Sequence, residues 1–291
     1  MPSLKEIKTR ILSVRSTRKI TSAMMMIASS KLRKIQKIIE TLYPYQQKLQ
    51  QLMELFVNSQ DNLASPFAEQ RQIKRVALIL FSSNTSLAGR FNENVISQLK
   101  VTVNEYLPLG KENIHIYAIG DKVREAARRL GFETPDNFRH IADKPSYEAT
   151  RQLASDLMEL FLNKKIDKVE LIYHHYKSKG TQELLRETFL PITLMTENEK
   201  WKIPRPDYIV EPDPQTIMDQ LIPKVLKLKL YTVHADSVSS EHAARTIAMQ
   251  TATDNADDLL DELTLQYNKL RQQSITNELL DIIGGSFGKP G

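Results

Sequence analysis

The sequence predicts a mixed α/β protein in which two very long helices, one at each end of the chain, flank an inserted α/β domain. Three observations predict this fold. Apolar residues recur in steps of three and four near both ends, short apolar runs alternate with helical patterns in the middle, and no glycine occurs before Gly89. Steps of three and four are typical of helices that pair in a coiled coil, and the alternation is typical of an open, Rossmann-like sheet.

The N-terminal helix is expected to begin at a capping box and to run over residues 3–57. Ser3 and Glu6 have the spacing at which each side chain bonds the other residue's backbone amide. The apolar residues of this helix form a stripe along one side, here called the seam, which is interrupted at Arg18 and Thr21 and changes phase once, after Ile35. Because an exposed apolar stripe is unfavourable in water, the seam requires a partner helix. Its members are Leu4, Ile7, Ile11, Val14, Met25, Ala28, Leu32, Ile35, Ile38, Leu42, Tyr45, Leu49, Leu52 and Phe56.

The middle of the chain predicts the inserted domain. Strands are expected at residues 76–81, 114–119, 168–173 and 184–190, separated by helices at 92–106, 122–130 and 147–162. Residues 200–214 then carry four prolines and read as an irregular connector. The predicted division is therefore a coiled-coil helix at 1–60, an α/β domain at 74–195, a proline-rich connector at 196–214 and a second coiled-coil helix at 215–285.

The C-terminal helix is expected to begin at Asp213-Pro214, a cap followed by the first helical position, where proline is favoured, and to stop after Ile283 at Gly284-Gly285. Between residues 235 and 256 its seam is filled with Ala, Ser and Thr, which would let a partner backbone approach closely. The two long helices are predicted to pair with each other as an intrachain antiparallel coiled coil. The regular seam continues through Ala256, Leu260, Leu263, Tyr267 and Leu270.

Charge and composition narrow the possible functions. The net charge is only +5, but residues 1–50 hold 11 basic and two acidic side chains, whereas residues 251–291 hold three basic and seven acidic ones. With no cysteine in the chain, disulfides and thiolate metal sites are excluded. No apolar run approaches the roughly 20 residues of a membrane span, and the N-terminus has no signal-peptide core. We therefore expect a soluble chain that associates with a membrane only through partners.

The sequence predicts no catalytic residue, cofactor or metal. Neither GxGxxG nor GxxxxGK[ST] occurs, so no phosphate cradle is encoded. His174 and His175 are adjacent at the end of a predicted strand and would point to opposite faces, so one is expected to be packed and the other solvated, without a shared metal. The basic first helix lacks the interleaved aromatic residues of single-strand binders, and acidic protein partners fit it better than nucleic acid. Met24-Met25-Met26 covers most of that helix's circumference and fits either a core or an interface.

Both ends of the chain resemble one family. The opening Ser3-Leu4-Lys5-Glu6-Ile7-Lys8, with Ser16 to Met24, is similar to the N-terminal helix of the gamma subunit of F-type ATP synthase. The segments Ala243-Ala244-Arg245, Ala252-Thr253-Asp254-Asn255-Ala256, Tyr267-Asn268-Lys269 and Ser274-Ile275-Thr276 resemble its C-terminal helix almost residue for residue. Glu211-Pro212-Asp213-Pro214 matches as well, and the resemblance covers the whole order of elements.

The resemblance implies a rotor shaft without catalytic residues. The coiled coil would enter a ring of alpha and beta subunits, and the α/β domain would sit with the epsilon subunit on a membrane ring of c subunits, whose ion-driven rotation changes the catalytic sites on the beta subunits. Matching positions imply beta-subunit contact or coupling for Arg271, Gln272, Thr276 and Glu278, and contact with the c-ring and epsilon for Tyr208 and Glu211. Charge and location suggest further basic contacts with beta for Arg10, Arg18, Lys19, Arg33 and Lys34.

The chain also departs from the family pattern. The loop after the first strand usually reads Ser-Thr-Asp-Arg-Gly-Leu-Cys-Gly, whereas residues 82–89 read Ser-Ser-Asn-Thr-Ser-Leu-Ala-Gly; the contacts of the usual loop are not carried over. Val210 stands where an aromatic residue is common, and Pro223 is unusual. The lack of an inserted cysteine pair and of a leader favours a bacterial protein on the cytoplasmic face of the inner membrane. Two alternatives remain: a coiled-coil scaffold or tether that does not rotate, and a nucleotide-dependent α/β enzyme with helical arms.

Overall fold

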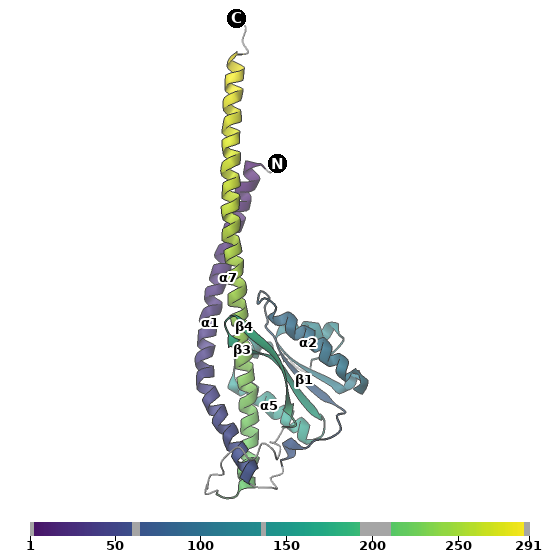
Figure 1. The fold of residues 1–291 in the computed structure, drawn as a ribbon. Helices are drawn as coiled ribbons and strands as arrows, with labels where there is room; N and C mark the ends of the chain where they lie inside the picture. Colours follow the sequence, from purple (N-terminus) through teal and green to yellow (C-terminus); the bar gives the residue numbers. More distant parts are fainter. Residues whose placement is uncertain (1–2, 60–64, 135–137, 193–210, 288–291) are drawn as a thin grey trace. The chain divides into compact units, whose positions relative to one another are not determined.

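The computed structural model describes residues 3–59, 65–134, 138–192 and 211–287, which form two compact units. The described residues up to Ala28 and from Thr246 onward make one unit, and residues 29–245 make the other. Two helices contribute to both: α1 (Leu4–Ser59) and α7 (Pro214–Phe287) (Figure 1). The prediction of a long helix near each end of the chain is confirmed.

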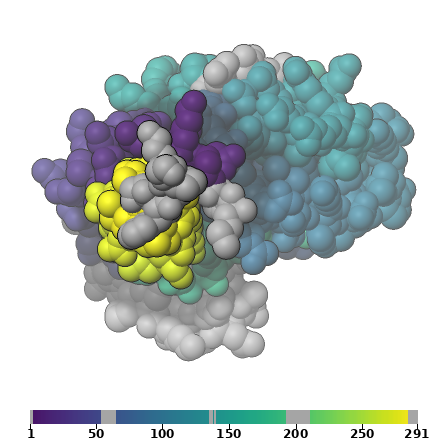
Figure 2. Space-filling model, turned by 90° about the horizontal axis from the view of Figure 1, so that it is seen from above, coloured from purple at the N-terminus to yellow at the C-terminus, as the bar shows by residue number. Residues whose placement is uncertain are grey.

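The smaller unit is an antiparallel helix pair. The start of α1 packs against the later part of α7, with Ile7 and Leu263 3% and 2% exposed (Figures 1 and 2). Thr21 Oγ1 lies 2.8 Å from Thr253 Oγ1, and Arg18 forms an ion pair with Asp257. The two residues that interrupt the apolar pattern of the sequence are therefore polar members of the seam that bond across it.

The larger unit is a three-layer α/β structure. Its sheet has the order β2-β1-β3-β4, with β1 parallel to β2 and β3, and β4 antiparallel to β3. Alternate residues of β1 pack on α2 and α3 on one face and on α5 and α7 on the other (Figure 1). The strands are β1 (Val76–Phe81), β2 (Ile114–Ile119), β3 (Lys168–Ser178) and β4 (Thr181–Leu190); the helices are α2 (Phe91–Tyr106), α3 (Asp121–Arg129), α4 (Arg139–Ala142) and α5 (Tyr147–Leu162).

Local signals place the ends of these elements. Ser3 and Glu6 form the predicted capping box, with Ser3 N donating to Glu6 Oε2 at 2.7 Å and Glu6 N donating to Ser3 Oγ at 3.2 Å. Asp213 caps α7 by accepting from Thr216 N at 2.8 Å. The predicted stop at Gly284-Gly285 is wrong, because α7 continues to Phe287. Glycine permits a left-handed helix end but also adopts right-handed helical dihedrals, so the pair does not force a stop.

After Ile35, the predicted seam of α1 is right at Leu42 and Leu49 and wrong by one residue at three other positions. Ile39 is buried, whereas Ile38, Tyr45 and Leu52 are 38%, 45% and 39% exposed. The observed seam keeps steps of four and three without a change of phase, through Ile35, Ile39, Leu42, Gln46, Leu49 and Met53. Gln46 occupies a seam position, so the hydrophobic pattern alone favoured its apolar neighbour, Tyr45. The predicted seam of α7 is confirmed, with Ala256 and Leu263 buried and its other three members half-buried.

The described residues show neither a membrane-spanning helix nor a cluster of metal ligands. Among the helices that the structure describes, none has an apolar stretch long enough to span a bilayer. Within the same residues, no three acidic or histidine side chains gather as metal ligands.

Candidate functional site: the junction of α7 with the sheet

The stretch of α7 between residues 232 and 245 is rich in polar residues and yet almost entirely buried, and it forms the junction between this helix and the sheet of the larger unit. The sequence predicted that these small residues would let a partner approach closely. The partners include β3 and the loop that follows β1, and not only α1. The buried polar side chains in this stretch are Thr232, His234, Asp236, Ser237, Ser239, Ser240, Glu241, His242 and Arg245.

Asp236 joins three elements at this junction. Its Oδ2 lies 2.6 Å from His175 Nδ1, and its Oδ1 accepts from Tyr176 N at 2.9 Å, so the carboxylate holds β3. Tyr43 of α1 bonds the same carboxylate and has a raised pKa, chiefly because it is buried. Burial also raises the pKa of Asp236, against the opposing effects of His175 and the Tyr176 amide. These bonds fix the lateral position of α7 on the strand.

His174 and Ser240 make the next contact along α7. Ser240 Oγ donates to the His174 carbonyl oxygen at 3.1 Å. The His174 ring is 1% exposed, points to the other face of the sheet and stacks on Phe91, with ring centroids 4.5 Å apart. Burial lowers the pKa of His174 to about 4, so the ring is neutral at pH 7. The prediction of one packed histidine is confirmed, but both histidines lie inside β3, and His175 is bonded to Asp236 instead of merely solvated.

Arg245 makes the third contact. Its Nη2 donates to Thr85 Oγ1 at 3.0 Å, and its Nη1 lies 2.5 Å from Glu241 Oε1. Arg245 and Glu241 are 8% and 3% exposed, so this is a buried ion pair with a further bond to the loop after β1. The loop residue Thr85 stands where the family pattern has arginine, and the structure gives it a partner within the chain.

The space at the carboxyl ends of β1 and β2 is closed by the chain itself. The first amides of α3 are already bonded: Asp121 N donates to Asn84 Oδ1 at 3.2 Å and Val123 N to Ser82 Oγ at 3.0 Å. Gly120 has φ +102°, and a Cβ there would lie 2.1 Å from the Ser82 carbonyl oxygen. Because these amides and this space are occupied, the N-terminal end of α3 offers no phosphate cradle.

Comparison with known proteins identifies the family. The family model described as ATP synthase matches residues 3–287. The ATP synthase gamma chain of Phocaeicola vulgatus is 54% identical over 288 residues, covering 99% of this chain and 100% of that protein. That of Bacteroides fragilis strain ATCC 25285 is 55% identical over 290 residues, with the same coverage. The chain belongs to the ATP synthase gamma-chain family.

Solved structures agree with the gamma-chain fold. A chain of the Euglena gracilis mitochondrial ATP synthase superposes with a TM-score of 0.61 at 16% identity, covering 98% of this chain and 93% of that one. A chain from the central stalk and c-ring structure of the Tetrahymena thermophila mitochondrial ATP synthase gives 0.58 at 19% identity, covering 80% and 99%. At these identities, the likeness concerns the fold.

The contact residues that the gamma-chain resemblance implied fall in different places. Arg271, Gln272, Thr276 and Glu278 are exposed on α7, beyond the last half-buried seam residue, Leu270. In Figure 1 this part of α7 extends past the N-terminal end of α1. The exposed hydrophobic residues Ile275, Leu279, Leu280, Ile282 and Ile283 share the same stretch. Such a density of exposed apolar side chains is typical of a helix that enters a protein partner.

The basic residues of α1 that were predicted to contact partner subunits lie partly in the smaller unit and partly in the larger one. Arg10, Arg18 and Lys19 are exposed in the smaller unit, where Arg18 already pairs with Asp257. Arg33 and Lys34 are exposed in the larger unit, as is Glu211, whereas Tyr208 lies outside the described residues. The structure thus does not gather the predicted residues into one site, and their roles stay predictions.

Sequence reasoning missed the junction itself. The sequence feature that could have revealed the junction is the presence of Asp236, Glu241 and Arg245 in a stretch of small residues of a helix that is otherwise predicted to be buried. Charged residues in such a buried stretch require partners. The sequence did not show that those partners are His175, the Tyr176 amide and Thr85.

Proposed function

We propose that this chain is the central rotor shaft of an F-type ATP synthase, coupling ion-driven rotation of a membrane c-ring to the conformational cycle of the catalytic sites on the beta subunits. The observation that carries the proposal is the full-length match: the family model covers residues 3–287, and gamma chains at 54–55% identity align over 99% of the chain. ATP synthesis and hydrolysis belong to the beta subunits, and this chain is a noncatalytic subunit.

The junction of α7 supports a mechanical role. A shaft that receives torque through its α/β domain must not slip against that domain. Asp236, Ser240 and Arg245 bond α7 to β3 and to the loop after β1, at positions where loss of a partner would leave a buried polar group unpaired. Because α7 continues as one helix into the smaller unit, a rotation applied to the sheet is passed along its backbone.

The partners follow from this function. The exposed end of α7, with Arg271, Gln272, Thr276 and Glu278, would meet the ring of alternating alpha and beta subunits, and the basic residues of α1 would meet acidic beta-subunit segments. Tyr208 and Glu211 would meet the c-ring and the epsilon subunit. The chain would then be a peripheral protein at the cytoplasmic face of a bacterial inner membrane, held there by its partners.

Reconstitution tests this function. The chain alone should hydrolyse no ATP, whereas adding it to the alpha and beta subunits should raise ATP turnover and give stepwise rotation. The natural chain has no cysteine, so Lys179→Cys, at the exposed β3–β4 turn, supplies a unique attachment point for a rotation probe. Assembly without rotation would favour the static scaffold, and turnover by the pure chain would favour the enzyme alternative.

A further inference from the structure

Two stripes on the surface of α1 compete for the same packing partners in the larger unit. The stripes share Leu42 and Leu49 and differ at three places, where the observed seam has the second residue of a neighbouring pair and the alternative stripe has the first. These pairs are Ile38-Ile39, Tyr45-Gln46 and Leu52-Met53. Because successive residues of a helix lie about 100° apart, a rotation of α1 about its own axis by about 60° would exchange one stripe for the other.

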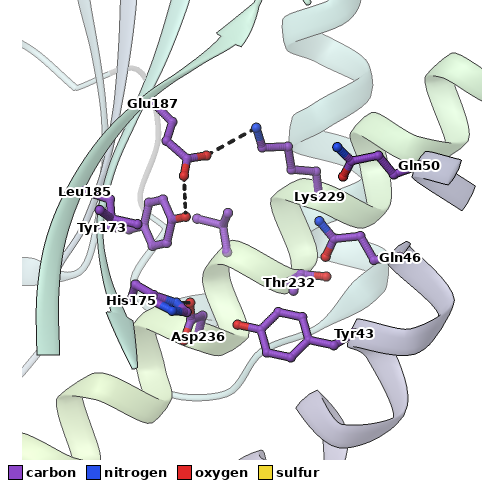
Figure 3. Close-up of a pocket in the computed structure, with 11 residues that line it drawn as sticks. Tyr43, Gln46, Gln50, Tyr173, His175, Leu185, Glu187, Lys229, Thr232 and Asp236 are labelled. Atoms are coloured by element: carbon purple, nitrogen blue, oxygen red, sulfur yellow. Dashed lines mark hydrogen bonds and ion pairs between the residues drawn. The ribbon is translucent and has the colours of Figure 1, made fainter. Parts of the chain in front are cut away.

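The apolar side chains do not explain why α1 uses the observed stripe. The first pair offers two identical isoleucines, Leu52 and Met53 are similar in volume and hydrophobicity, and Tyr45 would bury more apolar surface than Gln46. Close packing does not prevent the rotation either, because a cavity of about 360 Å³ lies between α1, the sheet and α7, beside Gln46 and Gln50 (Figure 3). Another contact must therefore select the stripe.

A polar contact distinguishes the two stripes. The hydroxyl of Tyr43 bonds the carboxylate of Asp236, and Figure 3 shows the Tyr43 ring pointing from α1 toward this residue of α7. Burial and the neighbouring carboxylate raise the pKa of Tyr43, so the hydroxyl keeps its proton and donates at neutral pH. Rotation toward the alternative stripe would move Tyr43 from about 80° to about 140° from the centre of the buried face. The bond to Asp236 is therefore compatible only with the observed stripe.

Asp236 can hold α1 in place because β3 holds Asp236. Its carboxylate lies 2.6 Å from His175 Nδ1 and accepts from Tyr176 N at 2.9 Å. A hydrogen bond to an anchored carboxylate is directional and outweighs an exposed contact such as that of Lys224 Nζ, 5.9 Å from the centre of the Tyr45 ring. In paired helices, single buried polar contacts of this kind fix one register among several that apolar contacts allow.

We propose that Tyr43 is a positioning residue, whose hydroxyl bonds Asp236 and thereby fixes the rotation of α1 about its own axis, so that α1, α7 and β3 turn as one body. Pro44 follows Tyr43 directly and cannot donate to the carbonyl oxygen of Glu40, so the helix backbone is weakened where the side-chain bond is made. The consequence for torque rests on the proposed function, whereas the selection of the stripe does not.

Thiol reactivity of single-cysteine variants tests the selection, because the natural chain has no cysteine. Ile39→Cys marks a position that only the observed stripe buries, and Leu49→Cys marks one that both stripes bury; the natural side chains are 8% and 7% exposed. Adding Tyr43→Phe should raise the maleimide reaction rate of the Ile39→Cys variant about tenfold or more, through loss of a hydrogen bond to a charged group. The rate of the Leu49→Cys variant should not change. Tyr45→Phe, which removes a hydroxyl from an exposed ring of the same helix, is the matched control and should change neither rate.

Two results would overturn the proposal. An unchanged rate in the Ile39→Cys variant would mean that the Tyr43 hydroxyl does not hold the stripe. Equal rises at both positions would mean that α1 detaches from its partners instead of rotating. Met53→Cys and Leu42→Cys give the same comparison at half-buried positions if the first pair of variants does not fold.

The reconstituted complex tests the consequence for torque. Tyr43→Phe should lower the torque with assembly unchanged, because α1 could then rotate about its own axis under load, and Tyr45→Phe should behave as the natural chain does. Natural torque in Tyr43→Phe would overturn this role of Tyr43. A complex that fails to rotate even with the natural chain would instead contradict the proposed function, and the thiol measurements on the chain alone would still decide which residue selects the stripe.

Discussion

Acid should weaken this protein through His174. The ring is 1% exposed, it stacks on Phe91, and neither ring nitrogen has a hydrogen-bond partner among the described residues. Burial without a partner penalises the charged form, which lowers the pKa from 6.5 to about 4. The unfolded chain then binds the proton more tightly than the folded chain. Stability that depends on the neutral ring is therefore complete above pH 6.5 and is lost as the pH falls from 6.5 toward 4.

The pKa values set the size of this effect. A difference of about 2.5 in pKa between the unfolded and folded states corresponds to about 3 kcal/mol of unfolding free energy, fully lost only below pH 4. Burial lowers the pKa of His234 to about 4 and that of His242 to about 3, so these rings act in the same direction. The whole chain should lose more stability than His174 alone explains. Comparison with a variant isolates the contribution of His174.

Urea unfolding of the full chain, followed by circular dichroism between pH 7 and pH 4, measures this contribution. His174→Leu removes the titrating ring, so its unfolding free energy should fall by about 2–3 kcal/mol less over this range than that of the natural chain. Any packing cost of the substitution is present at both ends of the range and cancels. Phe91→Leu is the control, because it weakens the same contact but keeps the ring that titrates. An equal loss of stability in the natural chain and in His174→Leu would refute the reasoning.

Three further predictions concern the junction, the sheet and the exposed end of α7. Asp236 has a raised pKa, so its ionisation costs stability as the pH rises above 3.8. The stability advantage of the natural chain over Asp236→Asn should therefore be largest near pH 4 and shrink toward pH 7 in urea titrations; an advantage that grows would contradict this. Gly120→Ala places a Cβ 2.1 Å from the Ser82 carbonyl oxygen, at a residue with φ +102°. The substitution should lower the unfolding free energy by about 3 kcal/mol or more. An unchanged melting temperature would count against the turn assigned to Gly120. Arg271→Ala with Gln272→Ala should leave folding and assembly intact but lower ATP-driven turnover or torque in the reconstituted complex, by the loss of contacts that would each contribute on the order of 2 kcal/mol. Natural rates and torque in that double variant, with Gln273→Ala as control, would remove the pair from the coupling mechanism.

The candidate site could be predicted only in part. The sequence marked His174 and His175 and correctly expected their side chains to point to opposite faces of the sheet, because alternation along a strand separates neighbouring side chains. It did not pair His175 with Asp236, which lies 61 residues away on another element. Hydrogen bonds of this range depend on how a strand and a helix cross, and no periodicity along the chain encodes that crossing. The exposed positions of Arg271 and Gln272 were expected from their place after the last seam residue, because a helix fixes which neighbours share a face.

The sequence by itself determined the fold class, the two long helices and the starts of their first turns. Capping at Ser3 and at Asp213 depends on residues three positions apart, and each strand of the sheet depends on its own apolar run, so these features are local. Tertiary structure alone decided that Ile39 and Gln46 lie in the seam instead of Ile38 and Tyr45. Apolar stripes one residue apart on a helix surface are nearly equivalent for the isolated helix. Packing against α7 and the sheet selected between them, because only contacts with other elements distinguish the two stripes.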